Sequence, residues 1–549
     1  MAGKASLRDL FFFSRIVLRR LRNPRSLWRK GGNSQTTQFK FQKYISLSCK
    51  PQLSSQTLIF DVEGLLLRSP SLFPYFMLVA FEGGGLLRSL ILFLLYPFVC
   101  MVSQEMGLKI MVFVCFFGIK AESFRVGRAV LPKYLLNDVG LEGFEALMKF
   151  QRNVGVSALP RVMIEGFLRD YLGIEFAVGR ELVVFRGYFL GLMEDKEKTS
   201  LVLEKMLGED KPSSHVVGIA GSNKHLHHLL FSQCKEIYWV NEAEKRSWSH
   251  LPKENYPKPL IFHDGRLAFR PTPQATLAAF MWFPMGLLLA IIRTVAGLLL
   301  PYNISGPILA LTGMRRRQTK PKSSPTTVSV IPTRKAKGTL YVCNHRTLLD
   351  PVYLSAALNK PLTAVTYSLS RVSELLSPIK TVRLTRDRER DAETMKKMLG
   401  RGDLVVCPEG TTCREPYLLR FSPLFAEMSD EIVPVAMDVE VSMFYGTTAA
   451  GLKCLDPLFF LMNPFPTYKV RLLDKVSGSS TCCDGGPSRF DVANHVQRRI
   501  GQALGFQCTK LTRKDKYLIL AGNEGMVAAV GNINKPIHQR SDLVCSHES

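Results

Sequence analysis

Acidic residues are scarce in this chain of 549 residues, and the resulting positive charge limits the classes of partner that we expect it to bind. Asp and Glu number 46 against 72 Lys and Arg, which gives a formal net charge of +26 at pH 7. An excess of this size indicates an anionic partner, such as nucleic acid, lipid headgroups or a phosphorylated substrate. The sequence also lacks zinc-finger spacing and an aromatic-and-basic RNA-binding pattern, so nucleic acid is not the expected partner.

The twelve cysteines form no disulfide framework. The sequence contains no C-x-x-C motif, and the scattered positions predict free thiols in a reducing compartment. A group of histidines, His225, His227 and His228, has no companion Cys or acid at metal-ligand spacing. We therefore expect a solvated loop there, and neither a bound metal nor a cofactor.

Long apolar runs suggest a membrane. Hydrophobic residues make up 46% of the chain and the mean hydropathy is +0.06, at the apolar edge of soluble proteins. Residues 86–103 and 107–119 form one pair of apolar runs, and 275–311 is a second apolar block that contains Pro284 and Arg293. A spanning helix needs about 20 such residues. Multi-pass crossing and re-entrant hairpins both fit, and core helices of a soluble domain are the alternative.

Basic segments flank these runs. Residues 1–50 carry twelve Lys or Arg and one acid, Asp9, which indicates an arm on lipid headgroups or, alternatively, a mitochondrial transit peptide. Residues 315–337 are basic and rich in Pro, Ser and Thr, as linkers are. The positive-inside rule then places both segments and the globular domains in the cytosol. The endoplasmic reticulum is the expected membrane, with the mitochondrion as the alternative. Residues 530–549 read as a loose polar tail.

Short apolar runs alternate with helical patterns between residues 338 and 520. This alternation predicts an α/β layer fold. The stretch 55–270 contains similar runs, such as Thr57–Phe60 and Val216–Ile219. We therefore expect two α/β domains separated by the apolar block and the basic linker.

The stretch Tyr341–Ser355, YVCNHRTLLDPVYLS, holds His345 and Asp350 with four residues between them. Transfer of an acyl group to an alcohol needs a base and a group that fixes the tautomer of that base. Five residues of a regular α-helix rotate by about 500°, so the pair can meet only across a strand-to-helix turn. The alternative is that Asp350, followed by Pro351, only caps a helix.

A second block, CPEGTTCREP, follows the apolar run Leu404–Cys407. Gly410 after a strand lets backbone amides approach an anion, and Glu409 has the chemistry to orient a substrate hydroxyl. An ordinary tight turn is the alternative. Between the blocks lies a basic cluster that includes Arg386, and arginine gives bidentate contacts to phosphate.

In order along the chain, NHRTLLD, TVRLTRDR, CPEGTTCREP and Ile432–Val435 resemble the four blocks of glycerolipid acyltransferases. The strings GTLYVCNHRTLLDPVYLS and PEGTTCREPYLLRFSPLF are similar to those of land-plant glycerol-3-phosphate acyltransferases of the cutin and suberin group. The resemblance covers residues 55–520 in organisation. It implies an N-terminal haloacid dehalogenase-like domain with membrane helices and a C-terminal acyltransferase domain at 338–520.

The resemblance also implies roles for residues. His345 becomes the general base and Asp350 its partner. The residues that bind the acyl acceptor are then Arg386, Glu409, Gly410, Thr411 and Arg414. Many relatives outside plants have Arg where this chain has Thr412, so phosphate contacts are expected to move to other arginines, Arg420 included.

Members of the plant group carry a phosphatase-like domain whose chemistry needs a D-x-D-G-T loop, a Ser or Thr, a Lys and a late acidic pair that holds Mg²⁺. The corresponding positions here are Asp61, Glu63, Ser157, Gly221 and His225. Glu63 is one methylene longer than Asp, which misplaces a proton donor. Gly221 and His225 replace the carboxylates that Mg²⁺ prefers. We therefore expect a degenerate site without phosphatase activity.

The implied function is transfer of an acyl group from acyl-CoA to glycerol 3-phosphate, at the sn-2 hydroxyl, in cutin, suberin or glycerolipid biosynthesis. With the phosphatase inactive, the expected product is lysophosphatidic acid. Two alternatives are acylation of a lysophospholipid and, from another class, a non-catalytic membrane scaffold. The sequence leaves acyl-chain preference and oligomeric state open.

Overall fold

The computed structural model describes residues 41–43, 56–194, 201, 203, 216–221, 234, 236–319, 338–367, 371–429, 431–477 and 488–522. Most of the predicted basic arm lies outside these residues, which include only β1 (Phe41–Lys43) from it. The predicted tail at 530–549 and His225 also lie outside them, as does the linker beyond residue 319.

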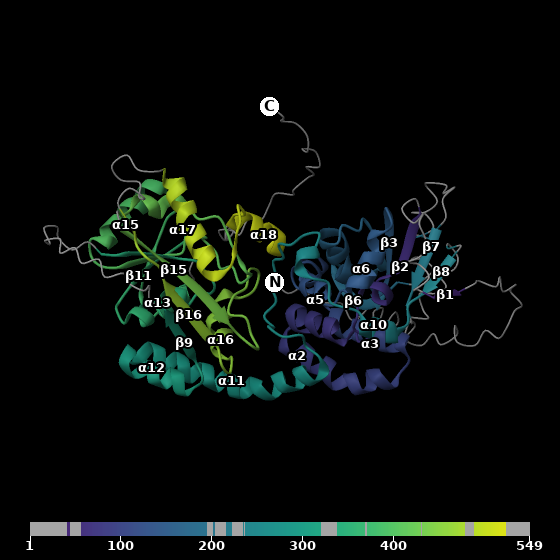
Figure 1. Cartoon of the computed structure of the whole chain (residues 1–549). Coiled ribbons are helices and arrows are strands. Elements are labelled where there is room, and N and C mark those ends of the chain that lie inside the picture. Colours follow the sequence, from purple (N-terminus) through teal and green to yellow (C-terminus); the bar gives the residue numbers. More distant parts are fainter. Residues whose placement is uncertain are drawn as a thin grey trace, which may run out of the picture. The chain divides into compact units, whose positions relative to one another are not determined.

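The first half is an α/β domain on a parallel sheet, with neighbouring strands in the order β8-β7-β2-β3-β4 (Figure 1). These strands are β2 (Thr57–Asp61), β3 (Arg152–Pro160), β4 (Phe176–Arg180), β7 (Val216–Ala220) and β8 (Glu236–Trp239). All residues of β2 and β7 are buried, as expected for central strands of a parallel sheet covered on both faces. The strands predicted at Thr57–Phe60 and Val216–Ile219 are confirmed.

Short helices and a hairpin surround this sheet. They are η2 (Val62–Leu66), η3 (Ala121–Ser123), α4 (Val126–Ala129), α5 (Leu131–Leu136), α6 (Leu141–Met148), α7 (Arg161–Glu165), η4 (Gly166–Tyr171), β5 (Leu182–Phe185), β6 (Tyr188–Met193), α10 (Glu242–Ser247) and η5 (Lys253–Asn255). The turn η2 directly follows β2, so Glu63 and Gly64 lie at the carboxyl end of the central strand.

Four helices carry the apolar blocks: α2 (Phe73–Met101), α3 (Gln104–Phe116), α11 (Pro273–Leu299) and α12 (Tyr302–Leu311). α2 bends at Gly85, whose φ of 79° and ψ of −174° are not helical. α11 continues through Pro284. The backbone therefore breaks at a glycine directly before the first apolar run and not at Pro284 of the second block.

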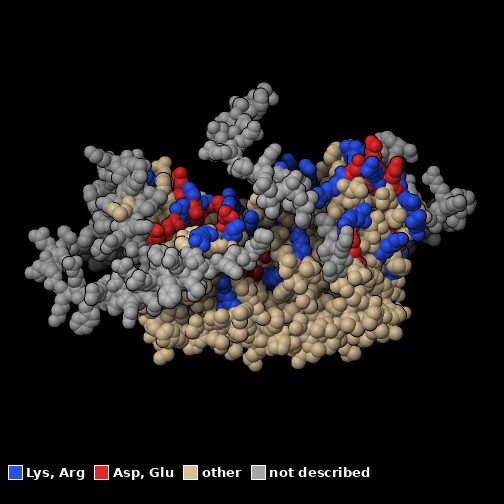
Figure 2. All heavy atoms as spheres, turned by 180° about the vertical axis from the view of Figure 1, so that it is seen from behind, with Lys and Arg blue, Asp and Glu red and all other residues tan. Residues whose placement is uncertain are grey.

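Among the described residues, α2 and α11 are long and apolar enough to cross a membrane, by length and composition alone. In the most apolar stretch of 18 residues of each helix, only 28% is buried in α2 and 17% in α11. Exposed large apolar side chains on the four helices include Leu87, Leu94, Met101, Met281, Leu299 and Leu311. Figure 2 shows charged side chains in the upper part of the view and an uncharged region below, where these helices lie. These features support membrane association.

The arginine inside the second apolar block is buried against backbone carbonyls. The Arg293 guanidinium donates to the carbonyl oxygens of Leu461 at 2.5 Å and Asn463 at 2.6 Å, at the end of α16 (Asp456–Leu461). The indole Nε1 of Trp282 donates to the carbonyl of Met462 at 2.8 Å. The carbonyls after a helix end need such donors, so these contacts fix α11 against the end of α16 in the second half of the chain.

The second half is built on a larger sheet with the order β12-β11-β13-β10-β15-β16-β9, and β17 also pairs with β15. The strands are β9 (Arg315–Thr319), β10 (Leu340–Cys343), β11 (Thr363–Thr366), β12 (Lys380–Arg383), β13 (Leu404–Val406), β15 (Glu431–Glu440), β16 (Thr467–Leu472) and β17 (Val476–Ser477). Strands β10 to β13 and β15 run parallel, and β16 is antiparallel to β15. The prediction of an α/β fold is confirmed for both halves.

The prediction of a linker over residues 315–337 is wrong for its first residues. Residues 315–319 form the edge strand β9, which pairs in parallel with β16. All five side chains are exposed, so the strand has no apolar face that periodicity could reveal.

Helices cover both faces of the second sheet. Besides α16, the helices of this half are α13 (Asp350–Leu358), α14 (Arg371–Leu375), α15 (Arg388–Leu399), α17 (Arg489–Leu504) and α18 (Arg513–Ala521), with the short elements β14 (Tyr417–Leu418), η6 (Pro423–Glu427), η7 (Lys453–Leu455) and β18 (Gln507–Cys508). Along β10, Leu340 and Val342 belong to the core shared with α15 and α17. Tyr341 and Cys343 belong to the core shared with α13. This alternation follows the two-residue period of a strand.

Candidate active site

Two neighbouring parallel strands bring the two sequence blocks together. β10 pairs with β13 in the register Leu340↔Leu404 and Val342↔Val406. Because the carboxyl ends of parallel strands meet at the same edge of a sheet, His345 and Glu409 emerge side by side. The sulfur atoms of Cys343, the last residue of β10, and Cys407, the residue directly after β13, lie 3.4 Å apart.

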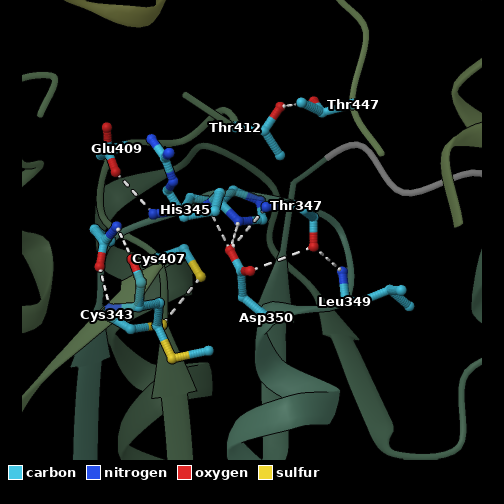
Figure 3. Close-up of polar contacts among 12 residues, drawn as sticks. Cys343, His345, Thr347, Leu349, Asp350, Cys407, Glu409, Thr412 and Thr447 are labelled. Carbon is cyan, nitrogen blue, oxygen red and sulfur yellow. Dashed lines mark hydrogen bonds and ion pairs between the residues drawn. The ribbon is translucent and has the colours of Figure 1, made fainter. Parts of the chain in front are cut away.

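His345 and Asp350 meet across the turn that the spacing required. Nδ1 of His345 lies 2.9 Å from Oδ2 of Asp350 (Figure 3). With the Nδ1 proton donated to the carboxylate, Nε2 is the nitrogen that can take a proton from a substrate. Asp350 opens α13 but does not cap it, because its side chain turns back and accepts the backbone N–H groups of Arg346 at 2.5 Å and Thr347 at 3.0 Å.

Asp350 is fully buried, and hydroxyl groups complete its contacts. Tyr468 on β16 donates to Oδ1, and the Thr347 hydroxyl lies 3.3 Å from the same oxygen. The Tyr468 ring stacks on Tyr353 of α13, with centroids 3.8 Å apart. Sequence reasoning missed Tyr468, because a tyrosine about 120 residues away in a different strand carries no local signal of this contact.

The backbone around His345 is held by Glu409. The backbone N–H of His345 donates to Oε1 at 2.7 Å, and that of Leu419 donates to Oε2 at 2.9 Å. Burial raises the pKa of Glu409 to about 7. The sequence predicted that Glu409 binds the acyl acceptor. Both of its carboxylate oxygens accept backbone amides, so its observed contacts position the base, and Glu409 also lines the cavity beside His345, so acceptor binding stays a prediction.

Burial opposes the charged form of His345, whereas the Cys407 thiol and the Asp350 carboxylate favour it. The net result is a pKa of His345 well above its ordinary value. A hydrogen bond with Cys343 and burial hold the pKa of Cys407 itself well above its ordinary value. Since that thiol is neutral, we attribute the raised pKa of His345 to Asp350.

His345 lines a cavity of about 1590 Å³. This volume exceeds the 300 to 1000 Å³, roughly, of ordinary ligand pockets. Apolar residues of α12 and α13 line it, among them Leu309 and Val352. The PEGT residues Gly410 and Thr411 also line it, and Gly410 has a positive φ of 67°. The cavity therefore offers an apolar space and a polar wall beside one base.

The predicted arginines differ in their placement. Arg386 lines the cavity, has a φ of 72°, and its guanidinium makes no hydrogen bond or ion pair with the described residues. Arg420 also lines the cavity. Arg414 does not. Its side chain is buried, donates to the Gly265 carbonyl at 2.6 Å and lies over the Tyr445 ring at 4.4 Å. The structure thus brings Arg386 to the site and leaves Arg414 in a structural contact.

The predicted phosphatase positions also come together, at the carboxyl ends of β2, β3 and β7. Asp61 is fully buried and accepts the N–H of Gly64 at 3.0 Å and that of Gly221 at 3.3 Å. Glu63 accepts the Ser157 hydroxyl. Lys245, which sequence reasoning missed, donates to the carbonyl of Glu63 at 2.6 Å.

A divalent metal does not fit this arrangement. A Cβ atom at Gly221 would lie 2.4 Å from the Cα of Gly64, so the two glycines fill the place where an acidic side chain would enter. Among the described residues, no group of three His, Cys, Asp or Glu is placed to hold a metal ion. Burial raises the pKa of Glu63 to about 8.

Comparisons with known protein families agree with the two halves. Residues 57–240 match a family model described as a glycerol-3-phosphate acyltransferase RAM2-like, HAD-like domain. Residues 322–438 match the acyltransferase family model. The chain thus combines an N-terminal haloacid dehalogenase-like domain with a C-terminal acyltransferase domain.

Curated relatives cover nearly the whole chain. It is 57% identical to probable glycerol-3-phosphate acyltransferase 3 of Arabidopsis thaliana, over 96% of this chain and 99% of that protein. It is 48% identical to glycerol-3-phosphate acyltransferase 1 of Arabidopsis thaliana, over 86% and 82% respectively. It is 43% identical to RAM2 of Petunia hybrida, over 85% and 97%. The chain belongs to the plant glycerol-3-phosphate acyltransferase family.

Proposed function

We propose that this protein transfers an acyl group from acyl-CoA to a hydroxyl of glycerol 3-phosphate and releases lysophosphatidic acid. The observation that carries the proposal is the His345–Asp350 pair at the wall of a cavity that also contains Arg386. The names of the relatives, glycerol-3-phosphate acyltransferases, give the acceptor.

The chemistry follows from the geometry. His345 Nε2 takes the proton of the acceptor hydroxyl while the oxygen of that hydroxyl attacks the thioester carbonyl carbon. Asp350 stabilises the imidazolium that forms. The tetrahedral intermediate collapses, the carbon–sulfur bond breaks, and the imidazolium returns the proton to the departing coenzyme A thiolate. Arg386 is placed to hold the phosphate of the acceptor by paired hydrogen bonds.

The phosphate stays on the product in this proposal. The Gly64–Gly221 contact leaves no room for an acidic metal ligand in the N-terminal half, so we infer that this half does not hydrolyse lysophosphatidic acid. Acylation at the sn-2 hydroxyl, and a role in cutin, suberin or glycerolipid synthesis, rest on the sequence resemblance alone.

The uncharged face of α2, α3, α11 and α12 is proposed to bind a membrane, with the endoplasmic reticulum as the expected one. Its support is the exposed apolar side chains of these helices and the net charge of +26. Because Arg293 and Trp282 tie α11 along the catalytic half, the proposal favours a re-entrant or in-plane arrangement over crossing helices.

An acceptor panel tests the proposal. Purified protein in mixed micelles is given one acyl-CoA and, in separate reactions, glycerol 3-phosphate, lysophosphatidic acid and lysophosphatidylcholine. The proposal predicts that only glycerol 3-phosphate is acylated efficiently and that no inorganic phosphate appears. Turnover of a lysophospholipid alone would favour the second acyltransferase function, and turnover of none would favour a scaffold.

A further inference from the structure

A short segment connects the phosphatase-like half to a loop of the acyltransferase half. We name residues 263–268 the strap and residues 443–456 the acceptor loop. Leu267 of the strap forms an antiparallel bridge with Phe444 of the loop. Two flanking backbone hydrogen bonds extend this pairing: from the N–H of residue 268 to the Met443 carbonyl at 2.9 Å, and from the Tyr445 N–H to the carbonyl of residue 266 at 2.7 Å.

Asp264 holds the middle of the acceptor loop. Its carboxylate accepts the backbone N–H groups of Ala449 and Ala450, the second at 3.0 Å. Its own N–H donates to the carbonyl of Ala129 at the end of α4, at 2.9 Å. The residue therefore links a helix of the phosphatase-like half to two amides of the loop.

Arg266 holds the end of the acceptor loop. Its guanidinium donates to the Leu452 carbonyl at 3.0 Å and forms a 3.0 Å ion pair with Asp456. Asp456 in turn accepts the N–H of Thr448 at 3.1 Å and its hydroxyl at 3.0 Å. The Arg266 N–H donates to Glu82 of α2 at 2.6 Å. The Arg266 side chain is 11% exposed and that of Asp456 is 2% exposed, so solvent screens this pair little.

The acceptor loop reaches the active-site cavity. Thr448 and Lys453 line it, together with Thr411 of the PEGT block. The Thr447 hydroxyl is hydrogen-bonded to that of Thr412 in the same block. The loop therefore supplies the Lys453 ammonium and the Thr448 side chain to the cavity lining. Lys453 also donates to the Tyr517 hydroxyl, and the strap holds the loop backbone at Ala450 and Leu452, between these two residues.

We propose that Asp264 and Arg266 are positioning residues for the acyl acceptor. They hold the loop so that the Lys453 ammonium contacts the phosphorylated acceptor, and the phosphatase-like half thereby contributes to acceptor affinity without touching the substrate. The inference rests on the proposed function, because it takes glycerol 3-phosphate as the acceptor.

Steady-state kinetics of the full chain test the proposal with Asp264→Asn, Arg266→Met and Arg266→Lys. Asparagine faces one of the two loop amides with an N–H group, and methionine removes the contacts to Leu452 and Asp456. For both variants we expect the KM for glycerol 3-phosphate to rise about tenfold, since small misplacements of binding groups are costly. The KM for acyl-CoA and the pH profile set by His345 are expected to stay unchanged. Arg266→Lys keeps the charge and should recover part of the loss.

Glu181→Gln is the matched control, because it removes an acid from an exposed ion pair with Arg161 in the same half. It should leave both KM values unchanged. The positioning role would be overturned by a fall in kcat/KM that is equal for glycerol 3-phosphate and acyl-CoA. A lower melting temperature with an unchanged KM for glycerol 3-phosphate would overturn it as well. If the wild type does not acylate glycerol 3-phosphate, the proposed function fails and the inference falls with it. If the wild type is active, unchanged kinetics in the variants would refute the positioning inference and leave the proposed function intact.

Discussion

The backbone N–H of His345 donates to Glu409 Oε1 at 2.7 Å, so the first motif is positioned by the second. The other carboxylate oxygen of Glu409 accepts the N–H of Leu419. Glu409 thus joins the turn that carries the base to the segment after the PEGT block. The two motifs form one hydrogen-bonded unit at the ends of β10 and β13.

Replacing Asp350 by Asn is expected to lower kcat by about 10³-fold, because the amide no longer fixes the tautomer of His345. The same change alters the pH dependence. His345 acts as a base only when neutral, and Asp350 raises its pKa, so the wild-type rate increases with pH through that pKa. Without the carboxylate the pKa falls, and the residual rate should reach its plateau at lower pH. An unchanged midpoint in the pH–rate profile would show that Asp350 does not set this pKa.

Replacing Glu409 by Gln is expected to change kcat and, separately, the pH dependence of the free energy of unfolding. We expect kcat to fall about tenfold, because an amide N–H then faces a backbone N–H and shifts the turn of His345. The pKa of Glu409 is raised from 4.5 to about 7, so the folded state binds a proton that the unfolded state releases. The contribution of Glu409 to the free energy of unfolding therefore falls as pH rises through this window.

The melting temperature of Glu409→Gln, relative to wild type, should accordingly rise from about pH 5 to about pH 8. Thermal unfolding followed by circular dichroism at several pH values measures this difference. A constant difference across the range would contradict the raised pKa.

Arginine variants distinguish the two placements found in the structure. Arg386→Ala should raise the KM for glycerol 3-phosphate about tenfold with an unchanged melting temperature, because a charge-assisted contact is lost and the side chain has no described partner. Arg414→Ala should instead lower the melting temperature, since its contacts to Gly265 and Tyr445 are structural. The reverse pattern would assign acceptor binding to Arg414.

Restoring an acid in the phosphatase-like half should not restore hydrolysis. Gly221→Asp forces a Cβ against Gly64, so the variant should lose about 1 to 3 kcal/mol of stability and release no phosphate from lysophosphatidic acid. Gly402→Asp is the control, because a Cβ there meets nothing within 4 Å. A metal-dependent phosphatase activity in Gly221→Asp would show that the two glycines do not block the site.

The sequence predicted the parts of the fold with strong local patterns. The buried strands β2, β7 and β10 contain short apolar runs, and α2 and α11 are long apolar blocks. The edge strand β9 escaped prediction because all its side chains are exposed and it pairs only through its backbone. The strap escaped it as well, since its pairing with Phe444 joins residues far apart in the chain.

At the candidate site, the spacing of His345 and Asp350 correctly required a strand-to-helix turn. Other features depended on contacts between distant elements. Tyr468 reaches Asp350 from β16, and nothing near it in sequence indicates that role. Glu409 carries the right chemistry for a substrate contact, and only the structure shows that backbone amides occupy both oxygens.

The most direct test of the account is acyl transfer to glycerol 3-phosphate by the wild type and by His345→Ala, with labelled acyl-CoA and separation of the products. The account predicts that the wild type forms lysophosphatidic acid and that the variant loses about 10³-fold in kcat, the contribution of a general base. Its melting temperature and its binding of glycerol 3-phosphate should stay close to those of the wild type. A variant that still makes lysophosphatidic acid at a rate near that of the wild type would contradict the assignment of His345 as the base.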